Sequence, residues 1–492
     1  MKGSVVHTPA SSSGGHTRHA STKATLAATL RPHWVYAMAV GSEIGWGAFI
    51  LPYDWLRSSG IGGIICGFVI ATLLVLVIGL NYGEAIRALP QTGGGILFAI
   101  SAVNRTAGFV VGWALTLGYA GIVALNASAM TLIFRLVTPG LLTHIKLYSV
   151  AGWDVYLPEV AVAIAFIAVF AYLNIRGFSF SGRFQFICVV VLLVAVAVLC
   201  VSVGYSSRSL SGVHIALFPN DTSHFAAIFG IVAIAPWAYV GFDSLPQLAG
   251  EFDFSPRKAR GLLVTGIVSA SLVYVVMSLV SSLSMGNDLD RFASEAWPTG
   301  SAVSGLVGGF GLVLMVCAVT AGVVTGLNGF TASASRVLYT MGTISMISPR
   351  FAAVDAKYRT PKFAIFFVAA VCAISPWFGR AALTWVVDMT SVGIAVAYLS
   401  ASFFRFRLSR GDELRGVSGV HASRGGEILG ILGCAISIFF MLLLLVPGMP
   451  GALGVPSLIA LGVWVCVGIA VHSAYHTKMA KIPDKDIFDQ AS

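Results

Sequence analysis

The amino-acid sequence predicts an all-α polytopic membrane protein with about twelve transmembrane helices. Its composition excludes a soluble chain and a disordered one, because 57% of the 492 residues are hydrophobic and only 10% are charged. A soluble domain carries about 25% charged residues, and a disordered chain combines low hydrophobicity with high net charge. The apolar runs are also long, and several reach the roughly 20 helical residues that cross a bilayer core of about 30 Å.

Helix breakers and charged residues separate these apolar runs into individual spans. The predicted spans cover residues 33–57, 61–87, 105–137, 157–176, 183–205, 224–250, 260–284, 301–330, 361–378, 382–404, 427–447 and 454–476. With a cytoplasmic N-terminus, only six of the 30 Lys and Arg residues fall outside, which is the positive-inside pattern. Those six are Arg57, Arg135, Lys146, Arg208, Arg291 and Arg380. We therefore expect both termini in the cytoplasm and the chain in a plasma or inner cell membrane.

Two of the spans contain helix breakers. VGSEIGWGAFILP (40–52) has three glycines ahead of a proline, and IAPWAYVGFDSLPQLAGE (234–251) has two prolines around a glycine. In lipid, each backbone group freed by a break costs several kcal/mol unless protein or a cavity satisfies it. The breaks fall in the first and sixth spans, as expected for an inverted five-plus-five repeat with a binding site near the bilayer midplane. A pair of kinked packing helices is the alternative.

The repeat divides the chain into five segments. They are a cytoplasmic tail (1–32), a first five-helix repeat (33–205), a second, inverted repeat (224–404), two additional helices (427–476) and a C-terminal cytoplasmic tail (477–492). The first tail has no apolar h-region after its start, so it is not expected to be a signal peptide.

Five stretches in order along the chain carry a resemblance to a known family. They are GWGAFILP (45–52), LNYGEAIRALPQTGGGILFAISAVNRTAGFVVGW (80–113), LNIRGFSFSGRFQ (173–185), SASRVLYTMG (333–342) with TPKFAI (360–365), and TSVGIAVAYLSASFFRFR (390–407). These motifs resemble those of the amino acid–polyamine–organocation permeases. The resemblance implies a LeuT-like helical fold and transport of amino acids or amines by alternating access.

The chain departs from the family pattern at three places. Trp46 stands between two glycines where the family usually has a small hydroxyl residue. Residues 343–345 replace an Arg-Asp-Gly stretch that many members carry. The fifth span, 184–205, lacks the lysine that substitutes for a sodium ion in some members. These departures leave the substrate and the coupling ion open.

The breaks and the resemblance together predict a substrate site. Its predicted residues are Ser42, Glu43, Gly45, Trp46, Gly47, Trp237, Ala238, Tyr239, Val240 and Gly241. The resemblance assigns a carboxylate contact to the N–H groups at Gly45–Gly47 and an ammonium contact to carbonyls near Glu43, Trp237 and Val240. The resemblance also implies an aromatic gate at Trp237, where an ammonium over the indole face gains about 0.5–2 kcal/mol; ordinary aromatic packing is the alternative. The side chain of Trp46 either narrows the site formed by these N–H groups and carbonyls, or points away from it and packs against other side chains.

Acidic residues lie in or at the edge of the spans, where an ionisable group is costly and is a candidate for function. Glu43 and Asp243 flank the breaks and are the predicted coupling residues, able to take a proton or to face a substrate ammonium. Glu84 and Glu159 lie near helix ends and are expected to be solvated at the interface or to cap a helix, and Asp388 is expected to be a satisfied structural carboxylate. Interhelical hydrogen bonds are expected from Asn126, Asn174 and Asn328.

The sequence lacks the motifs of the common catalytic sites, including GxSxG, HExxH and Walker A. No catalytic residue, cofactor or metal site is therefore predicted, and the seven cysteines lie in apolar runs without CxxC spacing. Basic residues are too dispersed to predict nucleic-acid binding. The predicted function is secondary active transport of an amino acid or related amine by alternating access, coupled to protons or to exchange, with an ion co-transported or exchanged. An amine or polyamine carrier and a transporter-like nutrient sensor are the alternatives.

Overall fold

The structure is a computed structural model that describes most of the chain. The described residues are 26, 28–138, 140–150, 153–209, 217–286, 288–295, 297–379, 381–417, 422–449, 451–483 and 486–488. Most of the predicted tail 1–32 and the last residues of the tail 477–492 lie outside this part of the chain.

The described chain is helical apart from one two-stranded antiparallel hairpin. The α-helices before the second predicted repeat are α1 (Pro32–Ile44), α2 (Gly47–Ile50), α3 (Pro52–Ala88), α4 (Gly94–Ala102), α5 (Arg105–Val137), α6 (Leu157–Ile175) and α7 (Phe178–Ser206). Those that follow are α8 (His224–Ala233), α9 (Ala235–Ala238), α10 (Ala259–Met285), α11 (Pro298–Val307), α12 (Gly309–Thr343), α13 (Lys362–Cys372), α14 (Ala381–Arg410), α15 (Arg424–Leu445) and α16 (Val455–Ala480). The hairpin strands are β1 (Lys146–Val150) and β2 (Trp153–Tyr156). Short 3-10 helices are η1 (Ser207–Ser209), η2 (Phe242–Glu251), η3 (Pro256–Lys258), η4 (Asp290–Phe292), η5 (Pro349–Ala352) and η6 (Ser375–Phe378).

Ten helical segments among the described residues are long and apolar enough to cross a membrane. Each overlaps one of the twelve predicted spans, and Pro52–Ala88 also includes the end of span 33–57. The two remaining predictions fall on shorter helices. Span 33–57 is divided among α1, α2 and the start of α3, and span 361–378 contains the short apolar helix α13 followed by η6.

Several predicted boundaries were wrong. The predicted span 301–330 is interrupted at Gly308, whose φ of 79° separates α11 from α12, and α12 continues to Thr343. The predicted span 33–57 extends too far, because a new helix, α3, already begins at Pro52, and proline favours the first turn of a helix. α3 itself kinks at Gly60, where φ is 64°. These boundaries depend on backbone conformations that hydropathy does not report.

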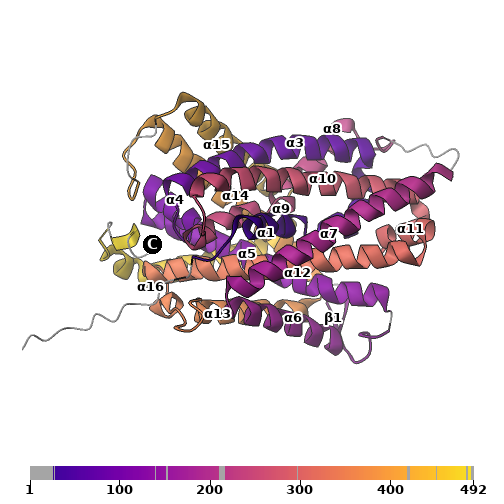
Figure 1. Ribbon diagram of the computed structural model, residues 1–492, viewed down its shortest axis with the longest axis horizontal. Coiled ribbons are helices and arrows are strands. Elements are labelled where there is room, and N and C mark those ends of the chain that lie inside the picture. The colour runs from indigo at the N-terminus through magenta and orange to yellow at the C-terminus, as the bar shows by residue number, and fades with distance from the viewer. Residues whose placement is uncertain are drawn as a thin grey trace, which may run out of the picture.

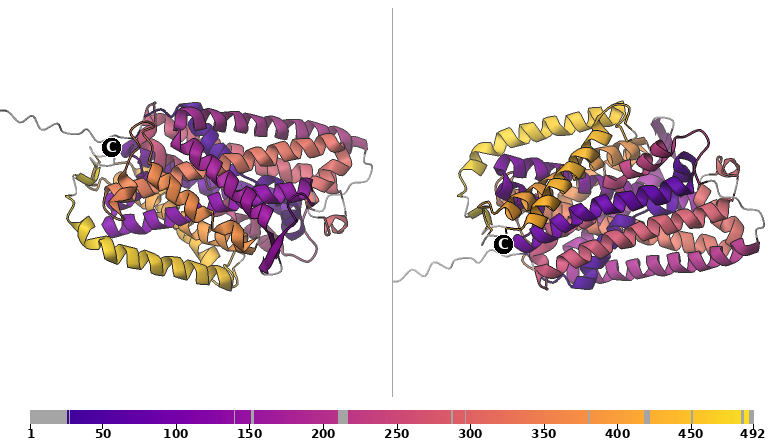
Figure 2. Two further views of the ribbon diagram at one scale, coloured as in Figure 1. Left: turned by 90° about the horizontal axis from the view of Figure 1, so that it is seen from below. Right: turned by 90° about the horizontal axis from the view of Figure 1, so that it is seen from above.

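α1 lies at the centre of the bundle (Figure 1) and packs against α7, α10 and α12. α12 in turn packs against α5 and α7, and α3 packs against α8 and α10. α16 runs along one edge of the molecule in both views of Figure 2, consistent with its few buried residues. α1 is therefore surrounded by longer helices, which hold the first interruption inside the protein.

Candidate functional site

The first interruption lies between α1, which ends at Ile44, and α2, which begins at Gly47. Gly45 has a φ of 51°, a conformation that glycine adopts at little cost. A helix of the second half approaches this point closely, because a Cβ atom on Gly322 of α12 would lie 2.0 Å from the carbonyl oxygen of Gly45. The first interruption thus depends on Gly45, which adopts the required backbone conformation, and on Gly322 of α12, which has no side chain to clash with it.

The second interruption lies between α9 and η2, across residues 239–241. Gly241 has a φ of 144°, and a Cβ atom there would lie 2.8 Å from the backbone nitrogen of Glu43. The two interruptions therefore touch each other, although they are about 200 positions apart in the chain. The prediction that both spans are broken is confirmed, and the structure brings the breaks together at one point.

Backbone carbonyls from both interruptions converge on the hydroxyl of Tyr274, which belongs to α10. The hydroxyl oxygen lies 2.9 Å from the carbonyl oxygen of Glu43, 3.2 Å from that of Ile44 and 3.2 Å from that of Ala238. These carbonyls end α1 and α9, where helical geometry provides no intrahelical donor. Sequence reasoning missed Tyr274, because a single tyrosine in an apolar span belongs to no motif.

The two carboxylates predicted for coupling are both buried but differ in their partners. Asp243 accepts a hydrogen bond from the backbone N–H of Gly241 and another from the hydroxyl of Tyr119, each at 2.8 Å. Neither carboxylate oxygen of Glu43 has a hydrogen-bond partner among the described residues. Because an unpaired buried charge is very costly, Glu43 gains most from a proton or from a cationic group beside it.

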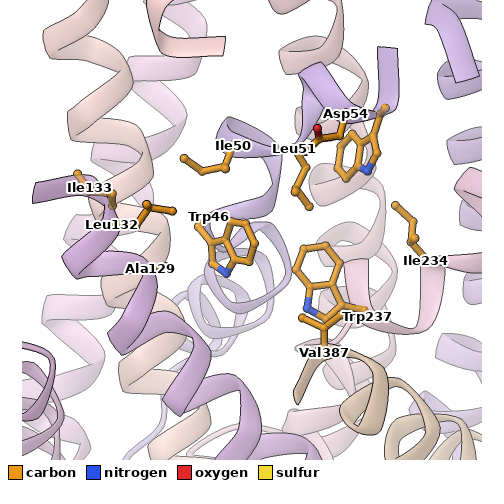
Figure 3. A pocket seen from close by; sticks show the side chains of 11 residues that line it. Trp46, Ile50, Leu51, Asp54, Ala129, Leu132, Ile133, Ile234, Trp237 and Val387 are labelled. Atoms are coloured by element: carbon orange, nitrogen blue, oxygen red, sulfur yellow. The ribbon is translucent and has the colours of Figure 1, made fainter. Parts of the chain in front are cut away.

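The indoles of Trp46 and Trp237 meet edge to face, with ring centroids 5.7 Å apart. On one side they line a cavity of about 320 Å³, shown in Figure 3, whose other lining residues are almost all apolar. On the other side they line a cavity of about 20 Å³ together with Glu43, Asn126 and Tyr274. The smaller cavity has room for a single water molecule. Trp46 thus lines both cavities and packs against Trp237.

The remaining predicted residues are divided. Ser42, Gly45, Gly47 and Val240 line the small cavity with the two indoles. Tyr239 does not line either cavity, because its hydroxyl is turned toward α3, where it lies 2.9 Å from the hydroxyl oxygen of Thr72. Ala238 contributes its carbonyl and Gly241 its close backbone approach, as described above. Within the described ranges, no three His, Cys, Asp or Glu side chains gather into a group that could hold a metal ion.

Residues 34–471 match the family of amino acid permeases. The chain belongs to this family. It is therefore a membrane permease rather than an enzyme.

Characterised relatives are similar over most of their length. The permease is 24% identical over 456 residues to the branched-chain amino acid permease of Lactococcus lactis, covering 90% of this chain and 94% of that one. It is 22% identical to the low-affinity putrescine importer of Escherichia coli, over 77% of this chain and 85% of that one. It is also 22% identical to the lysine-specific permease of Escherichia coli, over 79% of each chain. Both amino acid and amine carriers are thus among its relatives.

The three other acids that the sequence analysis placed in or at the edge of the spans have side-chain partners; this satisfies Asp388 as expected, whereas Glu84 and Glu159 form ion pairs instead of capping a helix. Each makes an ion pair or hydrogen bond of 2.6–2.7 Å to a side chain. The pairs are Glu84–Arg87, Glu159–Arg135 and Asp388–Ser457. These contacts give each of the three carboxylates a side-chain partner.

A buried amide network joins three helices of the permease beside the first break. Asn174 of α6 donates to the side-chain oxygen of Asn328 in α12 at 3.0 Å, and Asn328 donates to the side-chain oxygen of Gln185 in α7 at 2.8 Å. The predicted interhelical role of Asn174 and Asn328 is confirmed. That of Asn126 is wrong, because its amide donates to the carbonyl of Ile122 in its own helix at 2.9 Å. Gln185, which the sequence analysis missed, lies in the span that lacks the family's lysine.

Proposed function

We propose that this permease moves an amino acid or a related amine across a cell membrane by alternating access, as a secondary transporter coupled to protons or to exchange. One observation carries the proposal. The two interrupted helices touch, and the buried carboxylate of Glu43 stands at their junction without a hydrogen-bond partner among the described residues. A membrane protein keeps an unpaired buried acid at a structural cost, which is expected when a transported ion or substrate neutralises it.

The proposed architecture has twelve spans, both termini in the cytoplasm, and an inverted five-plus-five repeat. Support for the repeat comes from the position of the interruptions, which lie in the first and sixth predicted spans. Support for the orientation comes from the distribution of Lys and Arg along the sequence. The hairpin β1–β2, which contains Lys146, and the described C-terminal residues lie at opposite ends of the molecule in Figure 1, as this topology requires.

In the proposed site, the substrate ammonium binds the converging carbonyls of Glu43, Ile44 and Ala238. The substrate carboxylate binds the backbone around Gly45–Gly47, where the missing side chains permit close approach. Trp237 and Trp46 close over the substrate. Since the cavity that the two indoles line together with Glu43 is only about 20 Å³, substrate binding requires both rings to move.

Glu43 is the proposed coupling residue. Among the described residues, no donor contacts the carboxylate of Glu43, so its charge is uncompensated once it loses a proton. The carboxylate of Asp243, in contrast, accepts two hydrogen bonds from its neighbours. A proton on Glu43 would neutralise the site during one half of the cycle, and a substrate ammonium would neutralise it during the other. Both uses of the carboxylate avoid an unpaired charge in the membrane.

An amine or polyamine carrier is the second candidate, and the lining of the two cavities favours it. The described residues around them include the acids Asp54 and Glu43 but no Lys, Arg or His. Such a lining attracts cations and offers no basic side chain to a carboxylate. A substrate with ammonium groups and no carboxylate therefore fits this charge pattern at least as well as a zwitterion.

The test uses the purified full chain in two assays. Thermal unfolding is measured with a panel of amino acids and amines, since a ligand at 100 times its dissociation constant stabilises the folded state by about 2.7 kcal/mol. Compounds that stabilise the protein are then tested for counterflow into proteoliposomes, with and without a pH gradient, against protein-free liposomes. We expect stabilisation and counterflow by the same compounds. Absence of both for every amino acid and amine would contradict the proposed function.

A further inference from the structure

The hydroxyl of Tyr274 occupies the point where the carbonyls of the two interruptions converge. Three carbonyl oxygens lie within 3.2 Å of it, two at the end of α1 and one at the end of α9. A phenol has one hydrogen to donate, so it satisfies one of these acceptors well at any moment. An ammonium carries three donors and a full charge, and its hydrogen bonds to carbonyls are stronger than those of a neutral hydroxyl.

The aromatic ring of Tyr274 is held independently of these carbonyls. It stacks on Phe68 of α3, with centroids 5.0 Å apart and an angle of 9° between the planes, and it lies 5.8 Å from the ring of Trp55. The nearest ring contacts of Tyr274 are thus with α3, and its ring also lies 6.4 Å from that of Tyr239 in the second interruption, while the carbonyls belong to the interrupted helices. The hydrogen bonds of this hydroxyl join α10 to the two interruptions.

We propose that Tyr274 is a built-in substitute for the substrate ammonium, which holds the two interruptions together while the carrier is unloaded. The substrate displaces the hydroxyl when it binds, and the hydroxyl returns when the substrate leaves. This inference rests on the proposed function and adds a role for one residue that no motif marks. It makes Tyr274 necessary for the return of the empty carrier but not for exchange of one substrate for another.

The position of Glu43 supports displacement. Glu43 and Tyr274 both line the cavity of about 20 Å³, and a Cβ atom on Gly266 of the same helix α10 would lie 3.4 Å from Oε1 of Glu43. A displaced hydroxyl therefore leaves its carbonyls in the same cavity as a residue whose carboxylate has no hydrogen-bond partner among the described residues. An ammonium at this point meets three carbonyls and a nearby negative charge, whereas the phenol offers the carboxylate no charge. These three carbonyls are thus more complementary to an ammonium than to the hydroxyl of Tyr274 that contacts them.

The decisive variant is Tyr274→Phe, which keeps the ring stacked on Phe68 and removes only the hydroxyl. Without this competitor, substrate affinity should rise about threefold to tenfold, since one neutral hydrogen bond no longer has to be broken. Net uptake into substrate-free vesicles should slow about fivefold or more relative to exchange, because the empty carrier now closes over unsatisfied carbonyls. Binding is measured by calorimetry, and both transport modes are measured in the same proteoliposomes.

The matched control is Tyr36→Phe. Tyr36 of α1 also joins α1 to α10 through its hydroxyl, 2.8 Å from the hydroxyl oxygen of Ser269, but it touches no carbonyl of an interruption. This variant should leave the ratio of net uptake to exchange unchanged. A second measurement needs no loss of function: 3-fluorotyrosine placed at position 274 should show a shifted fluorine resonance when substrate saturates the protein.

The outcomes separate this inference from the proposed function. Weaker substrate binding by Tyr274→Phe, with net uptake and exchange falling together, would show that the hydroxyl binds substrate directly and would overturn the inference. An unchanged fluorine resonance on saturation would overturn it as well. If wild-type protein neither binds nor exchanges any amino acid or amine, the proposed function itself fails.

Discussion

Gly47 offers the sharpest test of the site, because its Cα faces the indole of Trp237. A Cβ atom at this position would lie 2.6 Å from Cη2 and 3.2 Å from Cζ3 of that ring, and 3.6 Å from the hydroxyl of Tyr274. Since carbon atoms pack best at about 3.5–4.0 Å, Gly47→Ala forces the indole outward by roughly 1 Å. The change falls on the side chain proposed to close over the substrate, so binding should suffer more than folding.

The expected magnitude follows from the cost of overpacking, which is typically about 1–3 kcal/mol. Gly47→Ala should therefore weaken substrate affinity by about tenfold. Gly47→Leu adds three more carbon atoms and should abolish transport while leaving membrane insertion intact. Affinity is measured by calorimetry, transport by counterflow, and insertion by the yield of monodisperse protein. Gly261→Leu is the control, because no heavy atom outside its own helix lies within 4 Å of a Cβ there.

A double-mutant cycle shows whether the effect acts through the indole. Trp237→Phe removes the outer ring that carries Cη2 and Cζ3, so Gly47→Ala should cost little further affinity in that background. Equal losses in the wild-type and Trp237→Phe backgrounds would refute the reasoning from this contact. Normal uptake by Gly47→Leu would remove the proposed binding site altogether.

Three further predictions concern the gate, the coupling acid and a buried ion pair. Trp237→Ala should weaken substrate affinity by roughly tenfold or more, and Trp237→Phe should keep part of the function, as measured by uptake kinetics. Glu43→Gln should lose accumulation driven by a pH gradient but keep exchange in proteoliposomes, whereas Asp243→Asn should keep both. Arg336→Met should lower the free energy of unfolding by about 3–5 kcal/mol, because it leaves the buried carboxylate of Glu251, now 2.8 Å from Nε of Arg336, without its charge partner.

Each of these predictions has a result that contradicts it. Wild-type affinity in Trp237→Ala would place the gate elsewhere. Loss of both exchange and binding in Glu43→Gln would assign this acid to the substrate ammonium, and cationic amines would then be affected most. Undiminished gradient-driven uptake in both acid variants would exclude Glu43 and Asp243 from coupling. Wild-type thermal stability in Arg336→Met would mean that the ion pair contributes nothing to folding.

Hydropathy located the spans well where helices are surrounded by lipid, since such segments must be apolar over their whole length. It located them poorly where polar groups are satisfied inside the protein. The predicted span 301–330 stops before Arg336, yet α12 continues to Thr343 because Glu251 pairs with that buried guanidinium. A prediction from hydropathy ends a span at such a charged residue. In the folded protein, an oppositely charged residue from a distant segment pairs with it, and the helix continues.

The sequence by itself determined the class of the protein and the positions of the two interruptions. Both follow from local properties: apolar composition decides the solvent, and Gly and Pro decide where a helix stops. Only the tertiary structure decided how the site is assembled. Glu43 and Asp243 look equivalent in the sequence, but in the described part of the chain the carboxylate of Glu43 has no hydrogen-bond partner, whereas that of Asp243 accepts two hydrogen bonds. The contact of Tyr274 with Glu43 joins residues 231 positions apart, and such a contact is set by helix packing, which no local pattern encodes.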